Sequence, residues 1–519
     1  MSGGLPCNGM STANRVTHRP ARGNAVAVLV AATYFMELLD GTIVSTAAPA
    51  MGRDLGVESS AIGVAITAYL VTLAVLIPIS GWLTDRLGSR TVFVAAIVVF
   101  TVASACCAGS ESLVELTGWR ILQGVGGSLM VPVGRLVVLR RAGRENLVTA
   151  IAILTWPALA APIIAPFVGG LLVDALSWHW IFLINIPLGI VAAAVALVLV
   201  PQERAPRRVP FDWVGSLLAC IGLGSLVVMA SLLALDTVPL GATVAAGALG
   251  LVCCALAMRH FRRTEHPILD LGAFRLETFR VSHAGGSLFR LAVSAVPFVL
   301  PLLFQDAWGW SAVEAGSAVL FVFVGNLGIK PATTPFLRAF GYRPVVVVST
   351  AVAAVTVGLM ALLTPATPFW AVVVLLVGSG AARSVGFTAY NTIAFADVEP
   401  GNMTAANTLS STLQQTASGF GVAVAAVVLS AAGAGGGGIG AQTRSGIVPS
   451  PDSWPYAVTF LVMAALLVAA FLEGLLMSPD AGSGVRPPRR ARAARAPHPA
   501  RPPSRSQKSS PPESEDDDF

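Results

Sequence analysis

Charged residues are scarce in this chain. Asp, Glu, Lys and Arg make up 12% of its 519 residues, about half of the roughly 25% that is usual in soluble proteins. Hydrophobic residues make up 55%, and the mean hydropathy is +0.75. This balance argues against a large soluble enzyme. It predicts an all-α protein that crosses a membrane many times, because only helices and closed barrels satisfy the backbone in lipid.

Patterns typical of metal sites, disulfides and catalysis are also missing. The six cysteines show no CxxC spacing, and most lie in apolar runs, which favours small buried side chains. The six histidines form no metal-ligand pattern. The stretch QGVGGS lacks the Lys-Ser/Thr of a phosphate loop. We therefore expect no enzyme activity, no cofactor and no metal.

Fourteen apolar runs are long enough to span a bilayer as helices, which takes about 17–25 residues each. The first run ends without a small-residue cleavage site, so we interpret it as a retained helix and not as a signal peptide. The approximate runs are 25–47, 61–82, 91–109, 113–139, 147–173, 178–200, 212–235, 240–258, 281–304, 313–335, 344–364, 368–396, 404–432 and 454–476.

The basic residues are distributed unevenly between the loops. With the amino terminus inside and the sides alternating, the inner loops and amino-terminal tail hold 18 arginines, whereas the outer loops hold Arg53 and Arg444. Cytoplasmic loops carry such an excess. This predicts that both termini are cytoplasmic, and it explains the net charge of +6 without a nucleic-acid partner.

Two tails flank the apolar runs. Residues 1–24 form the amino-terminal cytoplasmic tail, and 477–519 is rich in Pro and Arg and then acidic. The second tail has almost no apolar residues, so it cannot bury enough surface to fold and should be disordered. Its basic half could lie against anionic lipid headgroups or stay solvated.

Several charges fall within the predicted spans. Arg120, Arg290, Lys330 and Arg383 lie deep enough that each is a functional candidate by default. The alternative is structural, with each cation paired between helices or satisfied by carbonyl oxygens.

The motif GWLTDRLGSR follows the second span and begins at Gly81. Its Asp85 can pair with a cation, while Arg86 and Arg90 can cap neighbouring helix ends. Gly88 stands at the turn between the two helices. Such a cluster would lock two helices together on the cytoplasmic side, although alone it could be an ordinary solvated turn.

A weaker copy of this motif, RAFGYRPVVV, follows the tenth span. Gly341-x-Arg343 repeats Gly88-x-Arg90, and each pair follows the second span of its half. This predicts an internal repeat. We expect two six-helix bundles at 25–200 and 281–476, with two extra central helices and their flanking loops at 201–280.

Several motifs together resemble the major facilitator superfamily and its fourteen-span drug:proton antiporter branch, with most similarity to MdtD-type exporters. GWLTDRLGSR is similar to the loop-two signature of the superfamily. The other stretches similar to the branch are LLDGTIVSTAAP (38–49), WRILQGVGGSLMVPVGRL (119–136), SWHWIFLINIPLG (177–189), FDWVGSLL (211–218) and RSVGFTAYNTIAFADV (383–398). The resemblance implies the major facilitator fold and proton-coupled efflux across the bacterial inner membrane.

The fifth helix departs from the branch, in which Gly-Pro pairs precede Gly-Gly. This chain has Ala before both Pro162 and Pro166, followed by Gly169 and Gly170. Alanine still permits close helix packing, and both prolines still remove a backbone donor. The departure leaves open whether the transport is antiport.

Asp40 and Arg120 are expected at the same depth. Each lies about seven residues, or roughly 10 Å, from the outer end of its span. The resemblance implies that their helices are neighbours, so the two side chains can meet. A conformational change that opens and closes this contact would change the proton affinity of the carboxylate and couple proton flow to export.

Glu37 lies one turn before Asp40 on the same helical face. The two acids could titrate as a coupled pair, with Asp40 carrying the coupling proton and Glu37 attracting cations. Alternatively, Glu37 is water-accessible or paired with an arginine and has no transport role.

We expect a monomer that exports small amphipathic or cationic compounds, with the proton gradient as its energy source. There are two alternatives: an exporter dedicated to one metabolite or endogenous antibiotic, and a membrane sensor that transports nothing. Polar and aromatic side chains of the spans could line an apolar substrate cavity or simply join helices. These candidates are Gln123, Trp156, Phe298, Gln305, Asn326 and Asn391.

Overall fold

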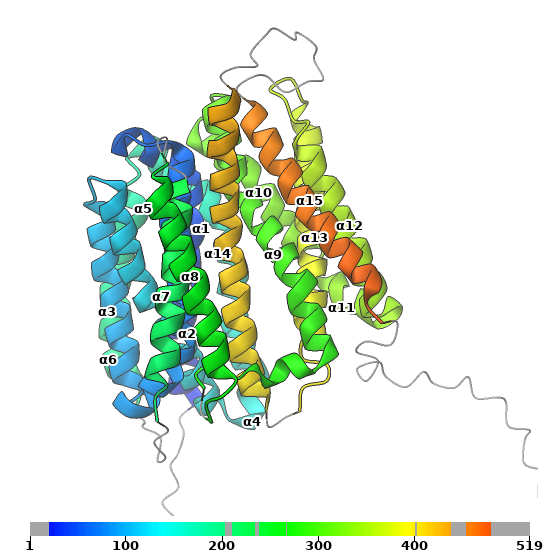
Figure 1. Cartoon of the computed structure of the whole chain (residues 1–519). Helices are drawn as coiled ribbons and strands as arrows, with labels where there is room; N and C mark the ends of the chain where they lie inside the picture. The colour runs from blue at the N-terminus through cyan, green and yellow to red at the C-terminus, as the bar shows by residue number, and fades with distance from the viewer. Residues whose placement is uncertain are drawn as a thin grey trace, which may run out of the picture.

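The computed structural model describes residues 20–202, 210–233, 238–265, 267–399, 402–436 and 453–478. All regular elements in these ranges are helical (Figure 1). The helices of the first half are α1 (Pro20–Leu55), α2 (Gly63–Leu87), α3 (Ser89–Ala108), α4 (Leu113–Ala175), α5 (Trp180–Leu183) and α6 (Asn185–Leu199). They are followed by α7 (Trp213–Leu233) and α8 (Leu240–Phe261).

The second half contains α9 (Glu277–Leu302), α10 (Ala312–Gly328), α11 (Lys330–Phe340), α12 (Tyr342–Met360), α13 (Phe369–Ile393), α14 (Met403–Gly436) and α15 (Trp454–Leu476). Two short 3-10 helices, η1 (Ser59–Ile62) and η2 (Leu271–Arg275), precede α2 and α9. A π-helical turn, η3 (Leu303–Ala307), extends α9. The predicted tails 1–24 and 477–519 lie almost entirely outside the described residues.

Within the described ranges, twelve helices are long and apolar enough to cross a membrane, or thirteen if α10 and α11 form one bent span. The break between these two is bent by 46°. The prediction of an all-helical, multi-pass protein is confirmed. The predicted fourteen spans exceed the larger count, thirteen, by one. The additional run, 147–173, lies within α4, whose side chains between Val138 and Ala160 are outside the described set; the described part, Ala160–Ala175, is an apolar segment shorter than a full span.

Helix α4 reverses direction along its length. Arg120 donates to Asp40 on α1, and a Cβ at Gly169 would lie 2.7 Å from Ile43, also on α1. A straight helix rises about 1.5 Å per residue, which would put these two positions of α4 roughly 70 Å apart. The arms Leu113–Val138 and Ala160–Ala175 therefore both pack along α1.

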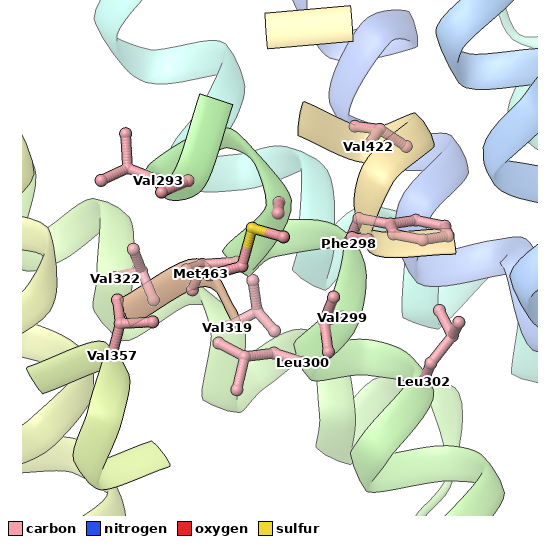
Figure 2. Close-up of a cluster of buried hydrophobic side chains, with 14 of the residues drawn as sticks. Val293, Phe298, Val299, Leu300, Leu302, Val319, Val322, Val357, Val422 and Met463 are labelled. Atoms are coloured by element: carbon pink, nitrogen blue, oxygen red, sulfur yellow. The ribbon is translucent and has the colours of Figure 1, made fainter. Parts of the chain in front are cut away.

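The second half packs around α9. Figure 2 shows buried side chains of α9, α10, α12, α14 and α15 that converge on one apolar cluster. Those labelled are Val293, Phe298, Val299, Leu300, Leu302, Val319, Val322, Val357, Val422 and Met463. A separate cluster, which includes Phe93 and Phe100 of α3, lies within the first half. The larger cluster also takes in first-half residues such as Ile43 of α1 and Phe182 of α5, so one apolar core continues across both halves.

The hairpin α7–α8 packs against α2 and α14 (Figure 1), one helix from each half. A Cβ at Gly222 of α7 would lie 2.7 Å from the Cys254 sulfur of α8, so glycine permits the close crossing. The Phe211 ring lies tilted against Trp82 of α2, and the Trp213 ring contacts Trp82 edge-on. This aromatic cluster attaches the hairpin to the end of α2 that carries the loop motif.

The two loop motifs are built alike. Gly88 joins α2 to α3 with φ 95°, and Gly341 joins α11 to α12 with φ 83°, which are left-handed values that favour glycine. Arg90 Nε donates to the Val200 carbonyl just after α6, at 2.6 Å. Arg343 Nη2 donates to the Leu475 carbonyl near the end of α15, at 2.8 Å. The predicted correspondence between the two loops is therefore present in three dimensions.

Candidate functional site

Asp40 and Arg120 form a buried ion pair. Arg120 Nη1 lies 2.5 Å from Asp40 Oδ2, and both side chains are fully inaccessible to solvent. Asp40 comes from α1 and Arg120 from the first arm of α4. The pairing that their depths predicted is thus present in the structure.

Three polar side chains complete a closed network around this pair. Gln123 accepts from Arg120 Nη1 at 2.7 Å and donates to Asp40 Oδ1 at 2.9 Å. Asn185 of α6 donates to the same carboxylate oxygen at 2.8 Å. Ser104 of α3 accepts from both amides and donates to the Phe182 carbonyl. Both Asp40 oxygens are therefore satisfied by groups from two other helices, α4 and α6.

Arg120 also contacts aromatic rings. Its guanidinium carbon lies 4.1 Å from the Tyr69 ring centroid and 5.8 Å from that of Phe182. Arg120 Nε and Nη2 have no hydrogen-bond partner. The cation–π contact with Tyr69 offsets part of the cost of burying these donors.

Glu37 lies close to this network but outside it. Its side chain is 9% exposed, and Oε2 is buried without a hydrogen-bond partner. A Cβ built at Gly127 would lie 3.5 Å from the Glu37 carboxyl carbon and 3.3 Å from the Tyr69 hydroxyl. No arginine pairs with Glu37 in the ranges that the structure covers. The carboxyl is therefore neither water-exposed nor ion-paired.

The loop-two residues hold the α2–α3 turn against α6. Gln202 donates to the Leu87 carbonyl at 2.8 Å and accepts from the Thr91 backbone. A Cβ at Gly88 would overlap the Gln202 side chain, so this turn requires glycine for space as well as for φ. Arg86 lies over the Trp82 ring.

A groove of about 490 Å³ lies beside this turn. Gly81, Asp85 and Arg86 line it from α2, and Asp212 and Ala405 are among the residues opposite them. The motif therefore contacts the inserted hairpin and borders α14 of the other half.

The second arm of α4 packs between the two halves. Gly169 lies against Ile43 of α1. Gly170 lies so close to α10 that a Cβ on Gly170 would overlap the carbonyl of Ala312. Pro166 closely approaches Gly316 in the same way, and Pro162 lies one turn earlier. Small residues thus let α4 and α10 cross with their backbones in contact.

Beyond the glycines, Asp174 caps α10. Its carboxylate accepts from the backbone N–H groups of Ala312 at 3.2 Å and Val313 at 2.9 Å. A carboxylate at a helix amino terminus is favourable because of the free N–H groups and the helix dipole. Two further hydrogen bonds join the halves, from Gln305 to the Thr46 carbonyl and from Thr67 to the Gly419 carbonyl.

The other intramembrane cations lie in the second half and do not join the Asp40 network. Arg290 of α9 donates to Asn391 of α13. Arg383 of α13 lies near Phe323 and Phe387. Lys330 is exposed and donates to Thr388 at 3.1 Å.

Most of the side chains that were predicted to line a substrate cavity instead lie in contacts between helices. Phe298 is buried against Gly63 of α2, and Asn326 lies where Gly380 of α13 crosses α10. Gln123, Gln305 and Asn391 make the hydrogen bonds given above. The side chain of Trp156 lies outside the described set.

Sequence reasoning missed three participants in the Asp40 site: Ser104, Asn185 and Tyr69. Asn185 offered a signal, since an asparagine deep in the apolar run IFLINIPLG is expected to find a partner. Ser104 and Tyr69 offered none. Where side chains are described, no group of three or more His, Cys, Asp or Glu could hold a metal ion.

Comparison with known proteins decides the family. The model of the Major Facilitator Superfamily matches residues 30–258 and 282–512. The chain belongs to the major facilitator superfamily. It is accordingly a multi-pass membrane transporter and not an enzyme, as predicted.

This major facilitator protein is similar to curated bacterial relatives. It is 37% identical over 400 residues to "Putative multidrug resistance protein MdtD" of Cronobacter sakazakii, covering 76% of this chain and 84% of the relative. It is 38% identical over 408 residues to the protein of the same name from Escherichia coli O7:K1, with 76% and 84% covered. The predicted similarity to MdtD-type proteins is confirmed.

Solved structures share the fold. The nucleoside transporter NupG superposes with a TM-score of 0.61 at 16% identity, covering 87% of this chain and 98% of that chain. A POT family transporter in complex with 5-aminolevulinic acid gives a TM-score of 0.64 at 14% identity, covering 89% and 97%. These similarities establish the major facilitator architecture alone.

Proposed function

We propose that this protein exports small amphipathic compounds across the bacterial inner membrane in exchange for protons, with Asp40 as the proton carrier. The observation that carries the proposal is the closed Asp40–Arg120–Gln123 network, buried within the first half. The relatives that are named as multidrug resistance proteins support the same direction of transport.

The coupling follows from the charges in the network. A proton taken up by Asp40 neutralises the carboxylate and removes its attraction for Arg120. The guanidinium is then held by Gln123 and by the Tyr69 ring. Because an unpaired buried charge is costly, the helices carrying the two groups favour a different packing once the pair is broken. Release of the proton on the other side restores the pair and the first packing.

Alternating access is supported by the positions of the contacts between halves. Thr46, Asp174 and Gln305 all lie near the end of the molecule where α1 meets η1 and where η3 leads into α10. This is the predicted outer end. The loop motif at Gly88 lies at the opposite end of α2. We assign closure of the outer side to the first set of contacts and the cytoplasmic gate to the loop motif.

The second arm of α4 completes a fourteenth crossing in this proposal, which places both termini in the cytoplasm. Exposed single cysteines at Glu111→Cys and Leu176→Cys should then react from the same side of the membrane with an impermeant maleimide, because two crossings separate them. Labelling from opposite sides would contradict the fourteen-span arrangement.

The test of coupling is dye export from everted vesicles that contain the protein. An imposed proton gradient should drive ethidium transport by the wild type, and a protonophore should abolish it. Asp40→Asn at equal protein level should remove this transport. Glu111→Gln, an exposed carboxylate whose side chain accepts no described hydrogen bond, is the matched control and should retain it.

Full proton-driven export by Asp40→Asn would show that the proton is carried elsewhere. Transport of one metabolite but of no dye would instead favour a dedicated exporter, and inserted protein without flux of any compound would favour a sensor.

A further inference from the structure

Two arginines of the second half share one aromatic ring. The guanidinium carbon of Arg290 lies 5.1 Å from the centroid of Phe387, and that of Arg383 lies 5.4 Å from the same centroid. Arg383 also lies 5.7 Å from the Phe323 centroid. Two cations on neighbouring helices therefore surround one side chain.

Neither arginine has an acidic partner among the residues that the structure describes. Arg290 is 4% exposed, and its described polar partner is the neutral amide of Asn391. Nε and Nη1 of Arg383 are buried and make no hydrogen bond. No carboxylate in the described ranges lies within 4.0 Å of either guanidinium. Glu473 of α15 instead lies against Gly285, and its Oε2 has no partner either.

This arrangement is costly without a bound anion. A buried guanidinium that lacks a counter-charge loses hydration that aromatic contacts only partly replace. Two of them in one region also repel each other. An anion that reaches Arg383 would satisfy its free N–H groups and lower the energy of both cations, since charge-assisted hydrogen bonds are the strong ones.

We propose that Arg383, with Phe387 and Phe323, binds the carboxylate end of an amphipathic organic acid, and that such acids are transported substrates. The inference rests on the proposed export function and names one class of its substrates. Arg383 receives the carboxylate on its free nitrogens, and the two rings contact the apolar part next to it. Arg290, oriented by Asn391, is a positioning residue that contributes charge without donating to the ligand.

The surroundings favour an organic acid over an inorganic anion. The rings beside Arg383 supply apolar surface that a small hydrated anion cannot use, whereas planar guanidinium groups and aromatic faces suit an aromatic or aliphatic carboxylate. Lys330 adds an exposed cation next to α13, through its hydrogen bond to Thr388. It would attract an acid towards this side of the bundle.

The experiment compares one xanthene dye as the free carboxylate and as its ethyl ester. Both forms are offered to vesicles that contain the wild type, Arg383→Gln or the control Arg338→Gln, which alters an exposed arginine of α11. Arg383→Gln should lower proton-driven transport of the carboxylate by about tenfold or more, the loss expected for a hydrogen bond to a charged group. Transport of the ester should change less than about twofold.

Direct binding separates this proposal from failure of export. Carboxylate dye binding to purified protein should weaken by a similar factor in Arg383→Gln, even if vesicle transport is absent. Arg383→Lys should recover part of the binding, because charge remains while the fork of donors is lost. Equal losses for acid and ester, or unchanged binding of the acid, would overturn the proposal.

Two other anions could occupy the site, and each gives its own result. Displacement of the dye by inorganic phosphate or chloride at millimolar concentration would identify an inorganic anion site. Displacement only in vesicles rich in phosphatidylglycerol, and not in phosphatidylcholine, would identify a lipid headgroup. Either result would overturn the assignment to a transported acid, whereas competition by the unlabelled free acid alone supports it.

Discussion

The two halves treat buried charge in opposite ways. In the first half, Asp40 and Arg120 neutralise each other, Gln123 and Asn185 hydrogen-bond to the pair, and Ser104 accepts from both amides. In the second half, Arg290 and Arg383 lie beside one phenylalanine, and in the described ranges no carboxylate is close enough to pair with them. The opposite charges of the first arrangement balance each other, whereas the two cations of the second have no counter-charge among the described residues.

The two arrangements suit two different functions. A pair that is closed in one conformation and broken in another is suited to carrying a proton. A cation that stays unpaired in the protein is suited to receiving a ligand. The Gly-x-Arg turns of the two halves are built alike. Their buried charges are not.

The largest expected effect comes from breaking the closed pair. Arg120→Gln should lower the free energy of unfolding by about 3–5 kcal/mol, because it leaves Asp40 buried without a counter-charge. Reversible unfolding in mixed micelles measures this loss. The double variant Asp40→Asn/Arg120→Gln should be clearly more stable than Arg120→Gln alone. If the double variant were the less stable of the two, the pair would not be the source of the effect.

A smaller effect should appear equally in both halves at the repeated turns. Gly88→Ala and Gly341→Ala should each cost about 1–2 kcal/mol, because both residues have left-handed φ values that alanine avoids. Gly88→Ala should cost somewhat more, since its Cβ also overlaps Gln202. Gly81→Ala has open space around it and is the control. A cost in only one turn, measured in the same micelles, would argue against their equivalence.

The smallest effect on stability is expected where the charge is unpaired. Arg383→Gln removes a buried cation with no acidic partner, so the free energy of unfolding should stay within about 1 kcal/mol of the wild type or increase. Thermal unfolding of purified protein without added ligand measures this. The same Arg→Gln change at Arg120 provides the comparison. A loss of several kcal/mol at Arg383 would mean that this arginine is held by the protein itself.

Much of the fold follows from the sequence for simple reasons. The apolar runs had to become helices, because the bilayer leaves no other way to satisfy the backbone. The helix α4 is the exception, because Leu113–Ala175 is one helix that contains two of the predicted runs. Run lengths alone gave fourteen spans and did not show that 113–139 and 147–173 belong to a single helix whose two arms both pack along α1.

The candidate site was predictable only in part. The meeting of Asp40 with Arg120 followed from counted helical rise and the family resemblance, since depth depends on the sequence once a helix is assumed. The roles of Gln123 and Gln305 did not follow. Both were candidates for a substrate cavity, but Gln123 belongs to the buried network and Gln305 joins the halves. The direction of each side chain depends on which helices are neighbours.

By itself, the sequence determined that the chain is a multi-pass helical membrane protein with a repeated turn motif and with charges at costly depths. Hydropathy and residue spacing carry that information, because the lipid acts on every segment independently of the others. Only the tertiary structure decided which charges meet. Asp40 reaches Arg120 across α1 and α4, and Asn185 joins the network from α6, whereas Arg383 lies beside aromatic rings and, where side chains are described, pairs with no acid. Such contacts join residues far apart in the chain, and only helix packing determines them.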